Sequence, residues 1–405
     1  MFVRTALVRL ALGDDAVAAT AIRVIAAADR WPDVLQLAVL WRVLPQVYDA
    51  LGRCGAIDDF DAGLRARLRG QVFAQALHSA SIVRTCAAVQ SLLAQAGVIS
   101  VAIKGVAAIA TIYGTASRRM VGDVDLVIDE DRLAPARTAL EDAGFVDVSP
   151  PFESHVAAIG FSRYLHNYAR TFVRDGVEID LHWQFGPRPP AALRARRIVE
   201  RSVEASAERV NVRASGPVET ALVATHHALR GSFPPSSTLK DSADLALWWQ
   251  RFGDAQGKAL IASALESGHA SSLLALGRVI ADRNAGDAIA RGVATMERTL
   301  PPADRREAER LRVFVEHNLR GESPDDTTVE LLAPAVFTRS IVGPLLHNIR
   351  RGGPHQGGDV PSVRRPLLVR IRGRIERAVR IGRELLRFER VASYRAVARA
   401  QSRFH

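Results

Sequence analysis

The sequence predicts an α+β fold, in which a mixed central sheet is flanked by large helical regions. Residues 1–96 are rich in Ala, Leu, Val and Arg at helical spacing, residues 97–186 mix short apolar strands with helices, and residues 187–325 return to a helical pattern. With 405 residues and 48% hydrophobic content, the chain has room for two or three domains. We therefore expect an N-terminal helical region, a mixed core and a helical bundle, followed by a basic region over residues 326–405.

The first core strand is expected over residues 98–103, directly after Gly97, which is placed to end the preceding helix. The strand ends at Lys104 and Gly105, and a helix is predicted over residues 106–113. A glycine at a strand-to-helix turn lets backbone N–H groups approach a phosphate closely. The chain has only three lysines among its 54 basic residues, so a lysine at this turn is informative. The pattern predicts a phosphate-binding turn, although an ordinary turn would show the same two residues.

Two aspartates, Asp123 and Asp125, lie one residue apart in the apolar run 120–128. Side chains two apart in a strand share a face, so both carboxylates would project together. Two like charges this close repel each other unless a cation neutralises them, and carboxylate oxygens suit Mg²⁺ or Mn²⁺ better than zinc. The pair is therefore a candidate metal clip, although a solvated strand edge would show the same spacing.

A second predicted strand covers residues 177–183, where apolar side chains alternate with Glu178, Asp180 and His182. Phosphoryl transfer with two metals needs about three carboxylates that converge from neighbouring strands. Asp180 is our candidate for the third carboxylate and is favoured over Glu178. Glu178 and His182 are equally compatible with surface positions on a half-exposed strand.

These motifs, in this order, resemble a known family. Lys104-Gly105, Arg119, the Asp-Val-Asp run 123–125 and the strand 178–183 are similar to the uncharacterised nucleotidyltransferase-like family of the DNA polymerase beta superfamily. The resemblance extends to flanking helical segments and covers roughly residues 30 to 250. It implies a polymerase-beta-like core that transfers a nucleoside monophosphate from an NTP to an acceptor, releases pyrophosphate and depends on Mg²⁺ or Mn²⁺.

The resemblance also implies roles for single residues. Asp123, Asp125 and Asp180 would be the catalytic and metal-binding carboxylates, and Asp180 would orient or deprotonate the acceptor. Gly105 would approach the triphosphate of the NTP.

Four further residues are implied in nucleotide binding, namely Lys104 and Arg119 near the phosphates and Lys240 and Asp241 in a base or acceptor pocket. Most members of the wider superfamily place a serine after the glycine, whereas this chain has Val106. The resemblance therefore implies that Lys104 or Arg119 replaces the missing hydroxyl contact.

The acceptor and the activity stay open at this point. Small molecules, RNA and modified peptides are acceptors in the superfamily, and many members of this family resemble accessory enzymes of peptide natural-product biosynthesis. The alternative is a non-catalytic nucleotide- or nucleic-acid-binding module with a nucleotidyltransferase fold, which the Val106 departure favours.

The positive charge of the chain is concentrated near its C-terminus. Residues 350–405 contain 15 arginines and four acidic residues, and the difference of +11 equals the net charge of the whole chain. Apolar residues near helical period accompany these arginines, so the region could bind RNA or another acidic surface. An arginine-rich helix packed on the bundle would show the same pattern.

The sequence also bears on location. It contains no run of 18 or more apolar residues, and charged residues interrupt the N-terminal segment, so we expect no transmembrane segment and no secretory signal. Its two cysteines are too few for a disulfide framework. A cytoplasmic location is the expectation.

Overall fold

The centre of the molecule is a seven-stranded mixed sheet with the strand order β3-β4-β5-β2-β1-β7-β6. The structure, a computed structural model, describes residues 2–149, 168–185, 193–229, 235–284 and 286–319. Strands β2 and β5 pair in parallel, as do β1 and β7, while the other neighbouring strands are antiparallel. The strands are β1 (Val101–Ala102), β2 (Val124–Val127), β3 (Val146–Asp147), β4 (Tyr168–Arg174), β5 (Val177–Gln184), β6 (Val203–Ala207) and β7 (Val210–Ala214).

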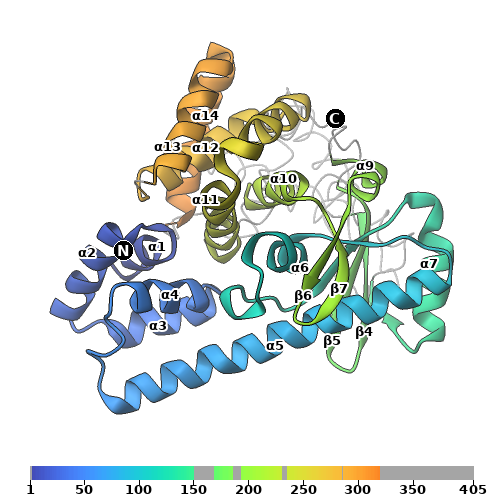
Figure 1. Ribbon diagram of the computed structural model, residues 1–405, viewed down its shortest axis with the longest axis horizontal. Helices are drawn as coiled ribbons and strands as arrows, with labels where there is room; N and C mark the ends of the chain where they lie inside the picture. Colours follow the sequence, from blue (N-terminus) through green and yellow to red (C-terminus); the bar gives the residue numbers. More distant parts are fainter. Residues whose placement is uncertain (1, 150–167, 186–192, 230–234, 285, 320–405) are drawn as a thin grey trace, which may run out of the picture.

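Helices surround this sheet, which confirms the predicted α+β class with large helical flanks (Figure 1). Helices α1 (Phe2–Leu12), α2 (Asp15–Ala27), α3 (Trp31–Leu40), α4 (Leu44–Arg53) and α5 (Ala62–Gln95) precede it. Shorter helical segments connect the strands: α6 (Lys104–Ala108), η1 (Ile109–Tyr113), η2 (Ala116–Arg118), η3 (Glu130–Arg132), α7 (Leu133–Asp142) and α9 (Ala195–Glu200). The bundle after the sheet consists of α10 (Pro217–Ala228), α11 (Pro235–Glu266), α12 (Ala270–Ala281), α13 (Asp287–Thr299) and α14 (Pro302–Leu319).

One face of the sheet packs on the C-terminal half of α5. Figure 1 shows α5 running from the N-terminal helices along the molecule to the strands. Its buried side chains Val83, Val89 and Leu93 share a hydrophobic core with Val124 and Leu126 of β2. Among the described helices, α5 alone is long and apolar enough to pass as a membrane span, with 33% of the tested stretch buried, and one such helix is weak evidence for a membrane protein.

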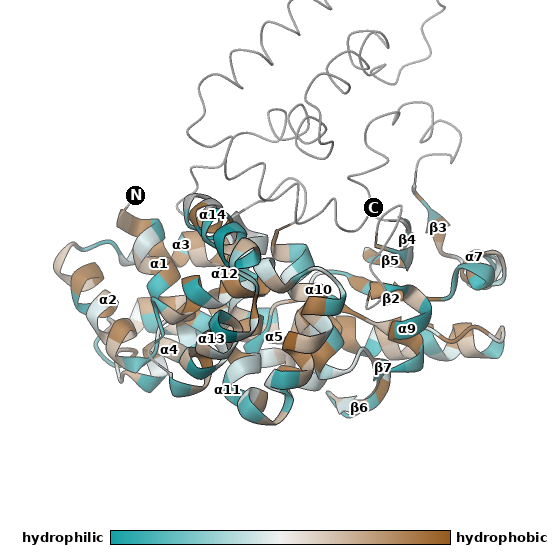
Figure 2. Cartoon of the chain, turned by 90° about the horizontal axis from the view of Figure 1, so that it is seen from above, coloured by the Kyte–Doolittle hydropathy of each residue, from teal (hydrophilic) through white to brown (hydrophobic). Residues whose placement is uncertain are grey.

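The other face of the sheet lies toward the helical bundle. Val127 of β2 belongs to a second hydrophobic core that includes side chains of α10, α11 and α12. Because successive side chains of a strand alternate between faces, Asp125 lies on the same face as Val127. Figure 2 shows both hydrophilic and hydrophobic stretches along α7 and α14, as expected for helices with one buried and one exposed face.

The hairpin β6–β7 was not predicted, because the sequence pattern after residue 187 favoured helices alone. Its two-residue turn consists of Glu208 and Arg209, which have φ values of 51° and 64°. Such turns usually carry Asn-Gly or Asp-Gly, so the usual sequence signal is missing. A tertiary contact compensates, since the Glu208 carboxylate accepts a hydrogen bond from the backbone N–H of Ala116 at 2.7 Å. The sheet therefore extends beyond the predicted core, to Ala214.

Other local predictions agree with the structure more closely. Gly97 and Gly144 adopt left-handed φ values of 72° and 82° after α5 and α7, as expected at helix ends. The first core strand is shorter than predicted, because only Val101–Ala102 pairs as β1. The basic region 326–405 lies outside the described residues, so its predicted contact with an acidic partner stays a prediction.

Candidate active site

The turn between β1 and α6 is unusual in its backbone. Lys104 begins α6 with φ of 51°, in the left-handed region that is uncommon for residues other than glycine. Such a conformation costs of order 1–3 kcal/mol and persists where the surrounding structure holds it in place. Here the side chain is held as well, since the Lys104 ammonium lies 2.5 Å from Oδ1 of Asp125.

Gly105 allows α6 to approach the segment that leads into β2. A Cβ atom at this position would lie 2.8 Å from Cγ2 and 3.1 Å from Cγ1 of Val121, which is closer than real Cβ atoms come. The absence of a side chain therefore brings the turn next to the strand that carries Asp125. Val106, the residue that follows Gly105, is buried.

Asp125 and Asp180 are direct neighbours across two parallel strands. Register pairs Asp125 with Asp180 and Val127 with His182, so these side chains share the face of the sheet that carries Asp125. One ligand atom from each of Asp125, Asp180 and His182 lies within 4.8 Å of the other two. Nε2 of His182 is 3.0 Å from Oδ1 of Asp125, and the Thr171 hydroxyl donates to Oδ1 of Asp180 at 2.6 Å.

The electrostatics of this group follow from burial and from the neighbouring charges. Burial alone would raise the pKa of Asp125, but the Lys104 ammonium and the hydrogen bond with His182 hold it well below its ordinary value. Burial, followed by the charge of Asp125, raises the pKa of Asp180. Burial and the nearby Lys104 lower the pKa of His182, which favours the neutral ring. The group thus combines two carboxyl groups, one lysine and one imidazole.

Arg119, in the segment before β2, is a buried charged residue that is only 1% exposed. Its Nε and Nη2 donate to the two carboxylate oxygens of Asp244, each at 2.6 Å, and Nη1 donates to the backbone oxygen of Met120 at 2.7 Å. The Tyr113 hydroxyl donates to the same Asp244 at 2.8 Å. These bonds tie the segment before β2 to α11. The direct nucleotide contact implied for Arg119 stays a prediction.

Lys240 and Asp241 lie on α11, close to Arg119. Oδ2 of Asp241 is 2.6 Å from Nδ1 of His227 on α10, and its Oδ1 is 4.0 Å from Nη2 of Arg119. Burial and the adjacent positive charge of Arg119 lower the pKa of Lys240. Within the described part of the chain, the Lys240 ammonium makes no hydrogen bond or ion pair. It is a positive charge held near the site without a bound carboxylate.

The structure brings Asp125 and Asp180 together and leaves the third predicted carboxylate, Asp123, outside their group. Asp123 is half-buried at the bend that precedes β2, and it is not part of the group formed by Asp125, Asp180 and His182. Its negative charge favours the charged form of both Lys104 and Lys240. It therefore opposes burial, which lowers the pKa of each lysine. Its metal contact stays a prediction.

His182 is the member of the group whose position the sequence left undecided. It is completely buried, whereas a surface position on a half-exposed strand had been equally compatible with its pattern. Its ring stacks on Phe185 at 5.8 Å, and Phe185 in turn packs edge-on against His226. Alternation along β5 already placed His182 on the face of Asp180, but its burial involves Phe185, against which His226 of α10 packs. Glu178, by contrast, is exposed.

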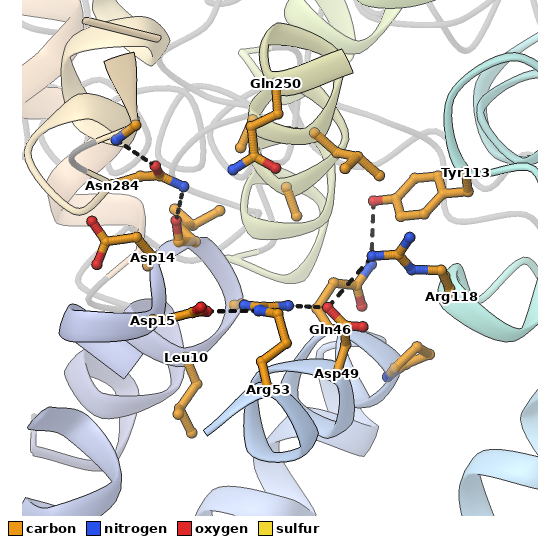
Figure 3. A pocket seen from close by; sticks show the side chains of 18 residues that line it. Leu10, Asp14, Asp15, Gln46, Asp49, Arg53, Tyr113, Arg118, Gln250 and Asn284 are labelled. Atoms are coloured by element: carbon orange, nitrogen blue, oxygen red, sulfur yellow. Dashed lines mark hydrogen bonds and ion pairs between the residues drawn. The ribbon is translucent and has the colours of Figure 1, made fainter. Parts of the chain in front are cut away.

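A cavity of about 370 Å³ lies apart from this group, between the N-terminal helices and α11 (Figure 3). Figure 3 shows Arg53 between Asp15 and Asp49, with Arg118 also near Asp49. Neither Asp125 nor Asp180 lines the cavity. Tyr113 lines the cavity and donates its hydroxyl to Asp244, the carboxylate that also binds Arg119.

A mixed sheet that places a lysine–glycine turn beside two aspartates on parallel strands is the arrangement expected of a nucleotidyltransferase core. Comparison with known proteins agrees: the chain belongs to the uncharacterised nucleotidyltransferase family, whose family model matches residues 27–285. No curated protein and no solved structure matches the chain. Membership of this family supports a general role in nucleotidyl transfer.

Proposed function

We propose that the protein transfers a nucleoside monophosphate from an NTP to an acceptor with the help of Mg²⁺ or Mn²⁺. The observation that carries this proposal is the register of β2 and β5, which sets Asp125 opposite Asp180 beside Lys104. Two adjacent carboxylates in a buried setting favour a divalent cation, because their charges otherwise raise the free energy of the folded state. Burial, and after it the negative charge of Asp125, raises the pKa of Asp180, and a bound cation would offset both effects.

The residues of the site suggest a division of labour. Asp125 and Asp180 would hold the cation, with Asp123 at the edge of the site. When bound, the cation would neutralise charge on the carboxylates and on the triphosphate. Lys104 would then be free to exchange Asp125 for a phosphate oxygen, and Lys240 would supply a second positive charge to the triphosphate.

The transfer itself would be an in-line displacement. A bond forms between the acceptor oxygen and the α-phosphorus of the NTP, and the bond to the bridging oxygen of pyrophosphate breaks. Asp180 would orient the acceptor and accept its proton. The acceptor belongs to one of three classes, namely a small molecule, a modified peptide of natural-product biosynthesis, or RNA. We place the reaction in the cytoplasm.

A transfer assay tests this proposal. The purified chain is incubated with each α-labelled NTP, Mg²⁺ or Mn²⁺, and fractions of small molecules, peptides and RNA. We expect label to enter one fraction, and Asp125→Asn or Asp180→Asn to lower the rate about a hundredfold or more, because each removes a charge that the cation needs. Asp175→Asn is the matched control, since Asp175 is exposed in the turn that joins β4 to β5.

Calorimetry separates catalysis from binding alone. Titration with ATP, GTP, CTP and UTP, with and without the divalent cation, measures nucleotide affinity directly. Nucleotide binding without transfer in any fraction would favour the non-catalytic module, for which the buried Val106 in place of a serine is the argument. The enzyme proposal fails if no NTP binds in the presence of either cation.

A further inference from the structure

The imidazole of His182 lies where a metal ligand would lie. Its Nε2 is 3.0 Å from Oδ1 of Asp125, and both atoms are close to a carboxylate oxygen of Asp180. Neighbouring ligands on a six-coordinate cation with bonds of about 2.1 Å are separated by about 3.0 Å. The observed separation of these two atoms therefore matches a pair of adjacent ligands as well as it matches a hydrogen bond.

The ring is fixed in this orientation by its surroundings. His182 is completely buried, stacks nearly parallel to Phe185 with an interplanar angle of 7°, and belongs to a strand that pairs on both edges. Among the described residues, Nδ1 of His182 has no hydrogen-bond partner, so the polar contact of the ring goes through Nε2 alone. The nitrogen that faces the two carboxylates is therefore placed to bind a cation together with them, in which case the proton of the neutral ring would lie on Nδ1.

We propose that His182 Nε2 binds the divalent cation together with Asp125 and Asp180, and that this nitrogen donor makes the site selective for Mn²⁺ over Mg²⁺. The inference rests on the proposed function for the presence of a cation, and it adds the ligand that decides which cation. Mg²⁺ is a hard ion that prefers oxygen ligands and keeps its water. Mn²⁺ also binds carboxylates, but as a first-row transition ion it accepts an imidazole among its oxygen ligands more easily than Mg²⁺ does. A set of two carboxylates and one imidazole thus disfavours Mg²⁺.

Pulsed electron paramagnetic resonance of Mn²⁺ bound to the full-length protein tests the ligand directly. We expect ¹⁴N coupling from an imidazole in the wild-type protein and loss of this coupling in His182→Gln. Asp180→Asn is the second variant, since it should weaken Mn²⁺ binding and remove the nitrogen signal together. His269→Gln is the matched control, because His269 is equally buried but lies in the bundle after α11. A wild-type spectrum of bound Mn²⁺ without nitrogen coupling overturns the proposal.

Titration calorimetry measures the selectivity. We expect His182→Gln to weaken Mn²⁺ binding by about tenfold or more and to leave Mg²⁺ binding within about threefold. Equal losses for both ions, or a wild-type preference for Mg²⁺, contradict the selectivity. Neither measurement needs turnover, so nitrogen coupling without any NMP transfer would reject the proposed function and keep this inference. NMP transfer by a protein whose bound Mn²⁺ shows no nitrogen coupling would keep the proposed function and reject this inference.

Discussion

At the scale of one residue, Lys240 is a positive charge that burial makes costly for the folded protein. Burial and the Arg119 guanidinium lower the pKa of its ammonium, and no described carboxylate lies within ion-pair distance. A lysine in such a place destabilises the free protein relative to an apolar side chain of similar size. A bound triphosphate would pair with this ammonium, so Lys240 would then stabilise the complex.

Lys240→Met should therefore have opposite effects on binding and on stability. Loss of one charge-assisted contact, worth about 1.5–3 kcal/mol, predicts about tenfold to hundredfold weaker NTP binding by calorimetry. Thermal unfolding should occur at the same or a higher temperature. Lys258→Met on the same helix is the control, because Lys258 is exposed and should change neither quantity. Unchanged NTP affinity in Lys240→Met would remove this lysine from the site.

The decisive element is the unit formed by β1, the turn at Lys104 and α6. The left-handed backbone of Lys104 and the missing side chain of Gly105 together bring the turn against Val121 and set the ammonium on Asp125. These contacts hold the turn in place, which would lower the entropic cost of binding a phosphate there.

Gly105→Ala tests this element. The added Cβ would collide with Val121, so the variant should be less stable by about 1–3 kcal/mol in denaturant unfolding and should bind NTP more weakly. The double variant with Val121→Ala supplies the missing space and should recover stability. If the glycine serves only to fit beside Val121, NTP affinity returns as well. If phosphates must approach its backbone closely, affinity stays low although stability returns.

At the scale of the whole molecule, the sheet separates two hydrophobic cores, and the site lies on the face that meets the bundle. The bundle carries its own buried histidine. Burial lowers the pKa of His269 to about 3. Between about pH 6.5 and pH 3 the unfolded chain binds a proton that the folded protein does not, so this group makes the folded state less stable as the pH falls through that window.

Acid unfolding should therefore depend on His269. We expect the free energy of unfolding to fall by about 1.4 kcal/mol per pH unit below pH 6.5 from this group alone. In His269→Gln this slope should decrease by the contribution of one proton, because glutamine does not titrate in this range. Urea unfolding at several pH values between 7 and 4 measures it. An identical slope in both proteins would mean that the ring is protonated in the folded state.

The sequence by itself determined the parts of the site that depend on neighbours along the chain. Alternation with a period of two placed Asp180 and His182 on one face of β5, and the lysine–glycine pair marked the turn. Both signals arise from local backbone geometry, which the sequence encodes within a few residues. The predicted mixed sheet with helical flanks follows from the same kind of pattern.

Only the tertiary structure decided which of these parts meet. The parallel pairing of β2 with β5 set Asp125 beside Asp180, and the partner of Arg119 is Asp244, 125 residues further along the chain. The hairpin β6–β7 and the burial of His182 behind Phe185 were likewise decided by the tertiary structure. Strand pairing and burial depend on contacts between distant segments, and no local pattern states which segments those are.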